Sequence, residues 1–286
     1  MTLIEFDNVT KWFPHSGGRA LLRKHLLRWM SRQRPAKFYA LRNVSFRVER
    51  GESVGVVGSN GAGKSTLLGL AAGLVAPDGG SVDRRGRIAT MLELGSGFHP
   101  DLTGTENLVL NASLIGLSRK QTREAFDSIV DFAGIQDFMN EPQRTWSSGM
   151  VARLAFAVAI HARADMFLID EVLAVGDAEF QKKCRGALAE FRRQGGSLLF
   201  VSHAATSVTE VCTRAIWLDH GQLMLEGSAA EVLAAYQAKA AAAGAATPAS
   251  GRDTTEESDK RTFVPKRAPR PRSARARESA RCIRRR

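Results

Sequence analysis

The stretch that decides the fold is Val54-Gly55-Val56-Val57-Gly58-Ser59-Asn60-Gly61-Ala62-Gly63-Lys64-Ser65-Thr66. Its second half matches the pattern G-x-x-x-x-G-K-[ST], in which glycines let the backbone curl so that successive N–H groups point at phosphate oxygens. An apolar strand pattern at Val54–Val57 precedes the loop and a helical pattern at Lys64–Leu74 follows it. The helix dipole adds to the attraction for an anion. We therefore expect a phosphate-binding loop in which Lys64 reaches the β- and γ-phosphates and the Ser65 hydroxyl binds Mg²⁺.

A second chemical element is the apolar strand Phe167-Leu168-Ile169, which ends in two carboxylates, Asp170 and Glu171. An acid at this end of a strand can hold the hydration shell of Mg²⁺, which we assign to Asp170. Its neighbour Glu171 can orient and deprotonate an attacking water. Many strands end in an acid, so the pattern is specific only in combination with the loop at Gly58–Thr66.

The order of the predicted elements indicates an α/β fold with a mostly parallel sheet covered by helices. The strands Ala40–Val48 and Ser53–Val57 look like a hairpin, and Arg19–Lys37 has the spacing of a basic amphipathic helix. A helical insert is expected at about residues 91–163. The other predicted helices and strands are Leu108–Leu117, Arg119–Ala133, Ser148–Arg163, Met166–Ile169, Ala178–Arg193, Ser197–Val201, Ala205–Val211, Ala215–Leu218 and Ser228–Ala243.

Most of the net positive charge lies at the C-terminal end of the chain. The 286 residues carry a net charge of +12, but residues 239–286 alone hold 14 Lys and Arg against 5 Asp and Glu. The rest is therefore nearly neutral, and the overall charge does not indicate a nucleic-acid-binding body. Residues 241–286 have almost no large apolar side chains, so we expect a disordered basic tail after a folded domain at residues 1–240.

A third motif is Trp146-Ser147-Ser148-Gly149-Met150, at the start of a predicted helix. It resembles the signature of the ATP-binding cassette (ABC) of ABC transporters, and the likeness covers about residues 3–240. This resemblance implies a P-loop NTPase fold with a RecA-like, mostly parallel sheet, an antiparallel β portion and a helical insert. It also implies that Ser147 and Gly149 contact the γ-phosphate held by a second copy. A simpler interpretation, that Ser147 only caps the helix, is compatible with it.

Further resemblances follow the order of that family. Asp177 matches the loop through which two cassettes contact each other, and His203 matches the histidine near the γ-phosphate. Trp12 matches the aromatic residue that stacks on adenine, with Phe13 and Tyr39 as alternatives. No glutamine occurs where the family binds Mg²⁺ and the membrane partner, and Glu93 is our choice for that position, with His99 next.

The sequences of these motifs resemble those of the branch of the family that exports bacterial polysaccharides such as capsule, O-antigen and teichoic acid. The resemblance implies an ATPase that uses ATP and Mg²⁺, forms a homodimer and pairs with a transmembrane permease. It implies a lipid-linked glycan substrate and a peripheral position on the cytoplasmic face of the inner membrane. No run of about 18 apolar residues suggests a membrane span in this chain.

Other interpretations fit parts of the sequence. One is a soluble ABC ATPase acting on the ribosome or on nucleic acid, which the single cassette and the absence of a long coiled-coil insert disfavour. The tail could meet anionic lipid, meet nucleic acid or simply be solvated, and its one aromatic residue, Phe263, gives few stacking platforms. We therefore expect no specific nucleic acid. The Arg19–Lys37 segment could be a plain surface helix or could meet the diphosphate of a lipid-linked substrate.

Overall fold

The computed structural model describes residues 1–14, 37–92, 95, 97–170, 176–202 and 205–245. One unit spans Met1–Ala246, and all that follows concerns it. Its strands are β1 (Thr2–Pro14), β2 (Lys37–Glu49), β3 (Ser53–Val57), β4 (Gly79–Arg84), β5 (Ile88–Met91), β6 (Met166–Asp170), β7 (Ser197–Val201), β8 (Arg214–Asp219) and β9 (Gln222–Ser228). Its helices are α2 (Lys64–Ala71), α3 (Gly104–Leu114), α4 (Arg119–Ala133), α5 (Ser148–Ile160), α6 (Ala178–Arg193), α7 (Ala205–Val211) and α8 (Ala229–Ala245), with short 3₁₀ turns at Gln136–Phe138 and Gln143–Thr145.

The central sheet has six strands in the order β5-β6-β7-β3-β8-β9. The first five run parallel, and β9 joins β8 in the antiparallel sense. Every residue of β3 and β7 is buried. Helices cover both faces of a parallel sheet, which is why its inner strands are mostly apolar, apart from the buried serines that begin β3 and β7, and do not alternate.

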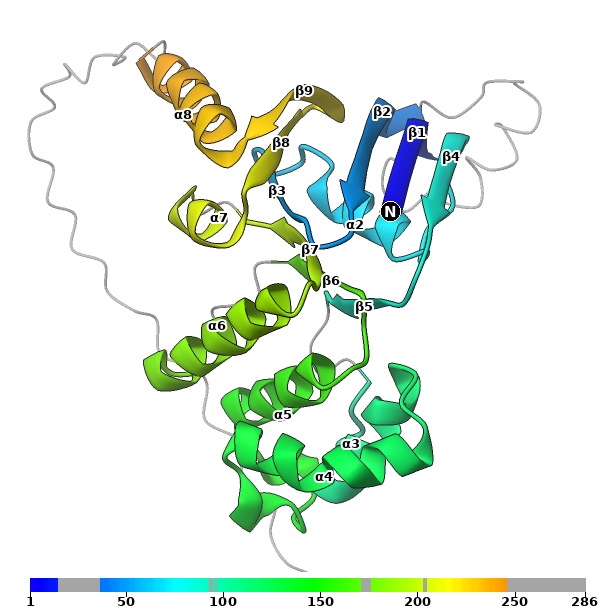
Figure 1. Cartoon of the computed structure of the whole chain (residues 1–286), viewed down its shortest axis with the longest axis vertical. Coiled ribbons are helices and arrows are strands. Elements are labelled where there is room, and N and C mark those ends of the chain that lie inside the picture. The colour runs from blue at the N-terminus through cyan, green and yellow to red at the C-terminus, as the bar shows by residue number, and fades with distance from the viewer. Residues whose placement is uncertain (15–36, 93–94, 96, 171–175, 203–204, 246–286) are drawn as a thin grey trace, which may run out of the picture. The chain divides into compact units, whose positions relative to one another are not determined.

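A second sheet of three antiparallel strands has the order β2-β1-β4 (Figure 1). In this sheet β2 alternates between buried and exposed positions over Val44–Val48, and β1 has both buried and exposed residues. The predicted hairpin of the strands at Ala40–Val48 and Ser53–Val57 is therefore wrong: β2 belongs to this sheet and β3 to the central one. The difference follows from burial, because β2 has one polar face and β3 has none. The chain changes sheet at Gly51, whose N–H donates to Ser197 Oγ on β7 at 2.7 Å.

The helices α3, α4 and α5 contact one another and form the expected insert. Thr103 and Ser118 begin α3 and α4, each in a reciprocal capping box with the residue three positions on, Glu106 or Gln121. Such boxes satisfy N–H groups that the first helical turn leaves without partners. Leu108, Ile129 and Leu154 are fully buried in the cluster that joins the three helices.

The predicted fold class is confirmed, and the elements at Arg119–Ala133, Ala178–Arg193, Ser197–Val201 and Ala205–Val211 have the expected bounds. The helix expected to begin at Leu108 begins at Gly104. Its first turn has no apolar side chain, so the hydrophobic pattern did not include it. Strands β4, β5 and β9 were not predicted. Neither β4 nor β9 has a buried residue, and the four-residue β5 has one, Met91, so none of them shows a strong apolar pattern. The helix expected at Arg19–Lys37 lies outside the described residues, apart from Lys37, which begins β2. Of the disordered tail expected at 241–286, residues 241–245 are instead the last turn of α8, whose alanine-rich sequence favours a helix, and the remainder lies outside the described residues.

Two interactions tie the sheets to the elements beside them. Arg84 on β4 donates from Nε to the carbonyl oxygens of Leu70 and Ala71, both at 3.1 Å, at the C-terminal end of α2. Arg214 on β8 pairs through Nε with Glu52 Oε1 at 2.6 Å and also contacts Glu226 on β9. Arg84 thus links the antiparallel sheet to α2, and Arg214 adds side-chain contacts to the pairing of β8 with its two neighbours, β3 and β9.

We predict that Arg214→Met lowers the free energy of unfolding by about 2 kcal/mol, because it leaves the partly buried carboxylate of Glu52 without its cation. Urea unfolding followed by circular dichroism measures the change. The matched control is Arg47→Met, since the Arg47 side chain is 70% exposed and meets Glu49 only at 3.7 Å. We expect the control to shift stability by less than about 0.5 kcal/mol. Equal changes for the two variants would show that the ion pairs of Arg214 do not stabilise the fold more than an exposed arginine does.

Candidate functional site

The loop between β3 and α2 is held closely by both sheets. A side-chain carbon at Gly58 would lie 2.3 Å from the carbonyl oxygen of Leu218 on β8. One at Gly63 would lie 2.5 Å from the carbonyl oxygen of Ala40 on β2, and Gly63 also has a φ of 107°. Only glycine fits either position without moving the backbone. The two glycines of the sequence motif are therefore required by packing as well as by conformation.

The N-terminus of α2 offers a positive environment. Gly63 is its N-cap, and among the described residues no side chain caps this end and no acid occupies the first turn. The ammonium of Lys64 lies over the loop, where it donates to the carbonyl oxygens of Gly58 at 2.6 Å and Ser59 at 2.9 Å. Backbone N–H groups, the helix dipole and a lysine thus converge on one place, as in anion-binding loops.

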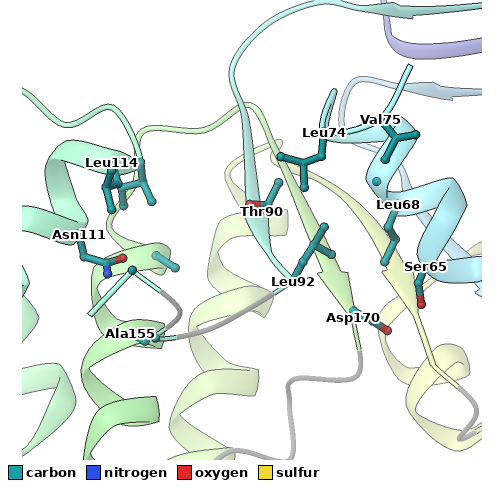
Figure 2. Close-up of a pocket in the computed structure, with 15 residues that line it drawn as sticks. Ser65, Leu68, Leu74, Val75, Thr90, Leu92, Asn111, Leu114, Ala155 and Asp170 are labelled. Carbon is teal, nitrogen blue, oxygen red and sulfur yellow. The ribbon is translucent and has the colours of Figure 1, made fainter. Parts of the chain in front are cut away.

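Two pockets meet at Ser65 and Asp170. One, of about 320 Å³, lies along the loop and the other, of about 610 Å³, extends toward α3. Ser65 and Asp170 lie at the same end of the larger pocket (Figure 2). The smaller pocket is lined by Phe38, Ala40, Asn60, Gly61, Gly63, Lys64, Ser65, Thr66, Asp170 and Val201.

A hydroxyl and a carboxylate lining one pocket are the hard oxygen donors that Mg²⁺ prefers. Within the described part of the chain no cluster of three or more His, Cys, Asp or Glu could hold a metal ion by itself. Mg²⁺ usually takes one or two protein ligands and completes its shell with water and phosphate. The residues present therefore fit a magnesium ion that a bound phosphate helps to hold.

The aromatic residue at the loop pocket is Phe38, which was not predicted from the sequence. Its cross-strand partner on β1 is Phe13, and paired residues of antiparallel strands share a face. Trp12 alternates to the other face, where the Lys37 ammonium lies 4.0 Å from its ring centroid, and its backbone N–H donates to Asp78 Oδ2 at 2.9 Å. The geometry favours Phe13 and Phe38 over Trp12 for stacking on a flat ring. In a strand, residues two positions apart share a face, so the spacing of Phe38 and Ala40 could have indicated that both lie on the side of the loop.

The motif at Ser147 lies on a separate pocket of about 500 Å³, which Gly149, Gly176 and Asp177 also line. Ser147 is the N-cap of α5, and its Oγ accepts from the N–H of Met150 at 3.2 Å. The capping interpretation is therefore realised, with the hydroxyl at the exposed start of the helix. None of the residues that line the loop pocket lines this one.

Asp177 is the N-cap of α6. Its Oδ1 accepts from the N–H of Phe180 at 2.9 Å and its Oδ2 meets an Arg153 guanidinium nitrogen at 2.5 Å. The hydrogen bond from Phe180, and then the charge of Arg153, hold the pKa of this carboxyl below its ordinary value. Asp177 thus stays ionised, as its ion pair with Arg153 requires.

Three predicted site residues, Glu93, Glu171 and His203, lie outside the described residues. The alternative to Glu93, His99, is held locally: its Nδ1 accepts from the N–H of Asp101 at 3.3 Å. Sequence reasoning overlooked Asn107, which is fully buried and whose Nδ2 donates to the carbonyl oxygens of His99 and Leu102 at 3.0 and 3.1 Å. An asparagine inside a helical pattern gave no sign that it organises the preceding loop.

A phosphate-binding loop between a buried parallel strand and a helix, beside a strand that ends in an acid, defines a P-loop nucleotide-binding domain. The family model "ABC transporter" matches residues 41–174. An O-antigen export system ATP-binding protein, RfbB of Klebsiella pneumoniae, is 45% identical over 239 residues, which cover 82% of this chain and 97% of that protein. The chain belongs to the ABC transporter family, as its motifs predicted.

Other relatives carry related names. A teichoic acids export ATP-binding protein, TagH of Bacillus cereus, is 41% identical over 236 residues, covering 82% of this chain and 42% of that protein. Among solved structures, the dimeric ATP-binding cassette MJ0796 in a post-hydrolysis state with ADP and Pi has a TM-score of 0.63. At 23% identity over 79% of this chain and 99% of that one, it supports the fold alone. The predicted polysaccharide-export branch is confirmed by the named relatives.

We predict that Gly63→Ala lowers the free energy of unfolding by roughly 1–3 kcal/mol, because alanine is strained at this φ and its methyl group meets the Ala40 carbonyl. Thermal and urea unfolding measure it. Gly186→Ala on the exposed side of α6 is the control, since no atom lies within 4 Å of its added carbon. That change should stabilise by up to about 1 kcal/mol. A neutral result at Gly63 would contradict the close packing of the loop.

Proposed function

We propose that this chain is the ATP-binding and ATP-hydrolysing subunit of an ABC exporter that drives a polysaccharide across the cytoplasmic membrane. The observation that carries the proposal is the loop at Gly58–Thr66 with Ser65 and Asp170 in one pocket, in a chain 45% identical to an O-antigen export ATP-binding protein. The loop indicates nucleotide chemistry, and the relatives indicate what that chemistry powers.

ATP is held from both ends of the loop pocket. Its phosphates take the N–H groups at the start of α2 and the ammonium of Lys64, which leaves the Gly58 and Ser59 carbonyls to reach them. The adenine ring stacks on the face shared by Phe13 and Phe38. Ser65 and Asp170 hold Mg²⁺, which when bound withdraws charge from the phosphate oxygens.

Hydrolysis needs a base at the end of β6, and Glu171 follows Asp170 directly in the sequence. Glu171 accepts a proton from water as the water oxygen forms a bond to the γ-phosphorus, and the bond from that phosphorus to the bridging oxygen breaks. The electron pair leaves with ADP, and inorganic phosphate is released. We assign His203 a hydrogen bond to the γ-phosphate and Glu93 the place of the family's glutamine, both from their positions in the sequence.

Two copies of the chain are required for a complete site. Ser147, Gly149 and Asp177 line one pocket and the phosphate loop lines another, and the two share no residue. A head-to-tail homodimer brings the first set of one copy to the nucleotide of its partner. Each composite site then has a phosphate loop from one chain and an N-terminal helical turn from the other, both of which favour anions.

The membrane-crossing path belongs to a separate permease. In the part of the chain that the structure describes, no helix combines the length and apolar character needed to cross a bilayer. Several apolar side chains of α3 are exposed, namely Val109, Leu110 and Leu114, the last at 66%. Leu114 also borders the 610 Å³ pocket, opposite Leu74 in Figure 2. We propose this pocket rim as the permease contact, which places the subunit on the cytoplasmic face of the inner membrane.

The same proposal includes the substrate and the domain organisation. The exported glycan is lipid-linked and is handled together with the permease, and the cassette occupies residues 1–240 with a basic tail at 241–286. The alternative, a soluble ABC ATPase on the ribosome or on nucleic acid, is disfavoured because the named relatives are export proteins and most of the net positive charge lies outside the cassette.

We predict that Glu171→Gln lowers the rate of ATP hydrolysis roughly 10²–10⁴-fold, because the amide keeps the shape but cannot accept the proton. The variant should accumulate as an ATP-bound dimer in size-exclusion chromatography with ATP and Mg²⁺. Lys64→Ala should fail to bind ATP and should form no dimer. Adding Ser147→Arg chains to Glu171→Gln chains should weaken the dimer, since each mixed pair has one blocked site.

The control for this experiment is Glu124→Gln, an exposed change on α4 where the carboxylate meets only Lys120 at 3.9 Å. It should hydrolyse ATP like the unchanged protein, measured with the permease present. Wild-type hydrolysis by the Glu171→Gln variant would exclude Glu171 as the base.

The adenine contact can be tested by comparing Phe38→Ala with Trp12→Ala. Because Phe38 lines the loop pocket and Trp12 does not, we expect roughly tenfold weaker binding of a fluorescent ATP analogue for Phe38→Ala and little change for Trp12→Ala. Isothermal titration with GTP should show the same order, since any base has a flat face. Weaker binding for Trp12→Ala alone would support the choice made from the sequence.

A further inference from the structure

Arg153 connects two elements that line the pocket of the Ser147 motif. It lies on α5, and its guanidinium reaches Asp177 at the start of α6, with an N–O distance of 2.5 Å. The same group lies 5.1 Å from the ring centroid of Phe180. Its side chain is only 25% exposed, so the contact is partly shielded from water.

The carboxylate of Asp177 is shared between two partners. One oxygen accepts from the Phe180 N–H and thereby begins α6, while the other meets Arg153. Arg153 therefore links Asp177, and with it the Asp177 loop (the described residues Gly176 and Asp177), to α5. Ser147, Gly149, Arg153 and Asp177 all line the same pocket.

Other contacts between α6 and the insert do not involve this loop. Lys183, farther along α6, donates to the carbonyl oxygens of Asp131 and Phe132 at the end of α4, at 3.1 and 2.9 Å. The rings of Phe132, Phe156 and Phe180 pack against one another at centroid distances of 5.7 to 6.1 Å. These contacts hold α6 on the insert independently of the Arg153–Asp177 pair. The effect that is specific to that pair is therefore on the position of Asp177.

We propose that Arg153 is a positioning residue: it holds the Asp177 loop against the Ser147 helix, so that a second copy meets one preformed surface. The inference rests on the proposed function, because it assumes that Ser147, Gly149 and Asp177 face a partner chain. An ion pair with one largely exposed member, as Asp177 is at 60%, adds little to fold stability, but preorganising an interface lowers the ordering cost of binding. Loss of the pair therefore affects assembly more than folding.

The test uses the full chain carrying Glu171→Gln, with dimer formation in ATP and Mg²⁺ followed by analytical ultracentrifugation. Arg153→Ala should raise the dimer dissociation constant about tenfold, while binding of a fluorescent ATP analogue to the monomer stays unchanged. Asp177→Asn should have the same effect, because asparagine caps a helix as well as aspartate but carries no charge for Arg153. The double variant should be no weaker than either single one, since both remove the same contact.

Two further variants separate positioning from general stability. Arg153→Lys keeps the charge and should recover part of the affinity. Lys183→Ala removes a cation that joins α6 to α4 without touching Asp177, and should dimerise normally. Melting temperatures of the Arg153→Ala and Lys183→Ala variants should agree within a few degrees.

Several results would overturn the inference: normal dimerisation of Arg153→Ala, losses that multiply in the double variant, or an equal loss for Lys183→Ala. Failure of the proposed function looks different. In that case the Glu171→Gln chain would form no ATP-dependent dimer even with Arg153 intact.

Discussion

The phosphate loop is packed tightly between the two sheets, and this packing is the constraint on which the rest of the site depends. The carbonyl oxygen of Leu218 approaches Gly58 from the central sheet, and that of Ala40 approaches Gly63 from the antiparallel one. The Gly221 N–H also donates to the Ala62 carbonyl at 3.0 Å. Both sheets must be in place before the loop has its shape, and the start of α2, the Lys64 position and the two pockets at Ser65 all follow from it.

The antiparallel sheet has a second role beside this one, because it supplies the aromatic face. A strand pair shows one set of alternate residues to each side, so Phe13 and Phe38 are presented together while Trp12 and Tyr39 are turned away. Tyr39 is stacked under the Arg42 guanidinium, 4.7 Å from its ring centroid. The choice of aromatic residue is thus decided by strand register, a property that exists only once β1 and β2 have paired.

The same distinction explains what could be predicted from the sequence. The loop at Gly58–Thr66, the strand that ends at Asp170 and the helix after Ser147 are local, since each depends on residues next to one another in the chain. Long amphipathic helices such as α4 and α6 were also predicted with correct bounds because their buried faces repeat at helical spacing. By contrast, the sheet to which β2 belongs, the face of Trp12 and the contact between Arg153 and Asp177 depend on partners far away in sequence.

The Arg84 contact has a consequence for the opposite end of α2. The guanidinium supplies positive charge to the carbonyl oxygens of Leu70 and Ala71, where the helix dipole is negative. At the other end the dipole is positive, and Gly63 provides no anionic cap. The helix dipole is thus compensated by a charged group at its C-terminal end only, and a bound phosphate supplies the negative charge at its N-terminal end. An arginine on the antiparallel sheet and an anion at the loop therefore act on a single dipole from its two ends, along the length of one eight-residue helix.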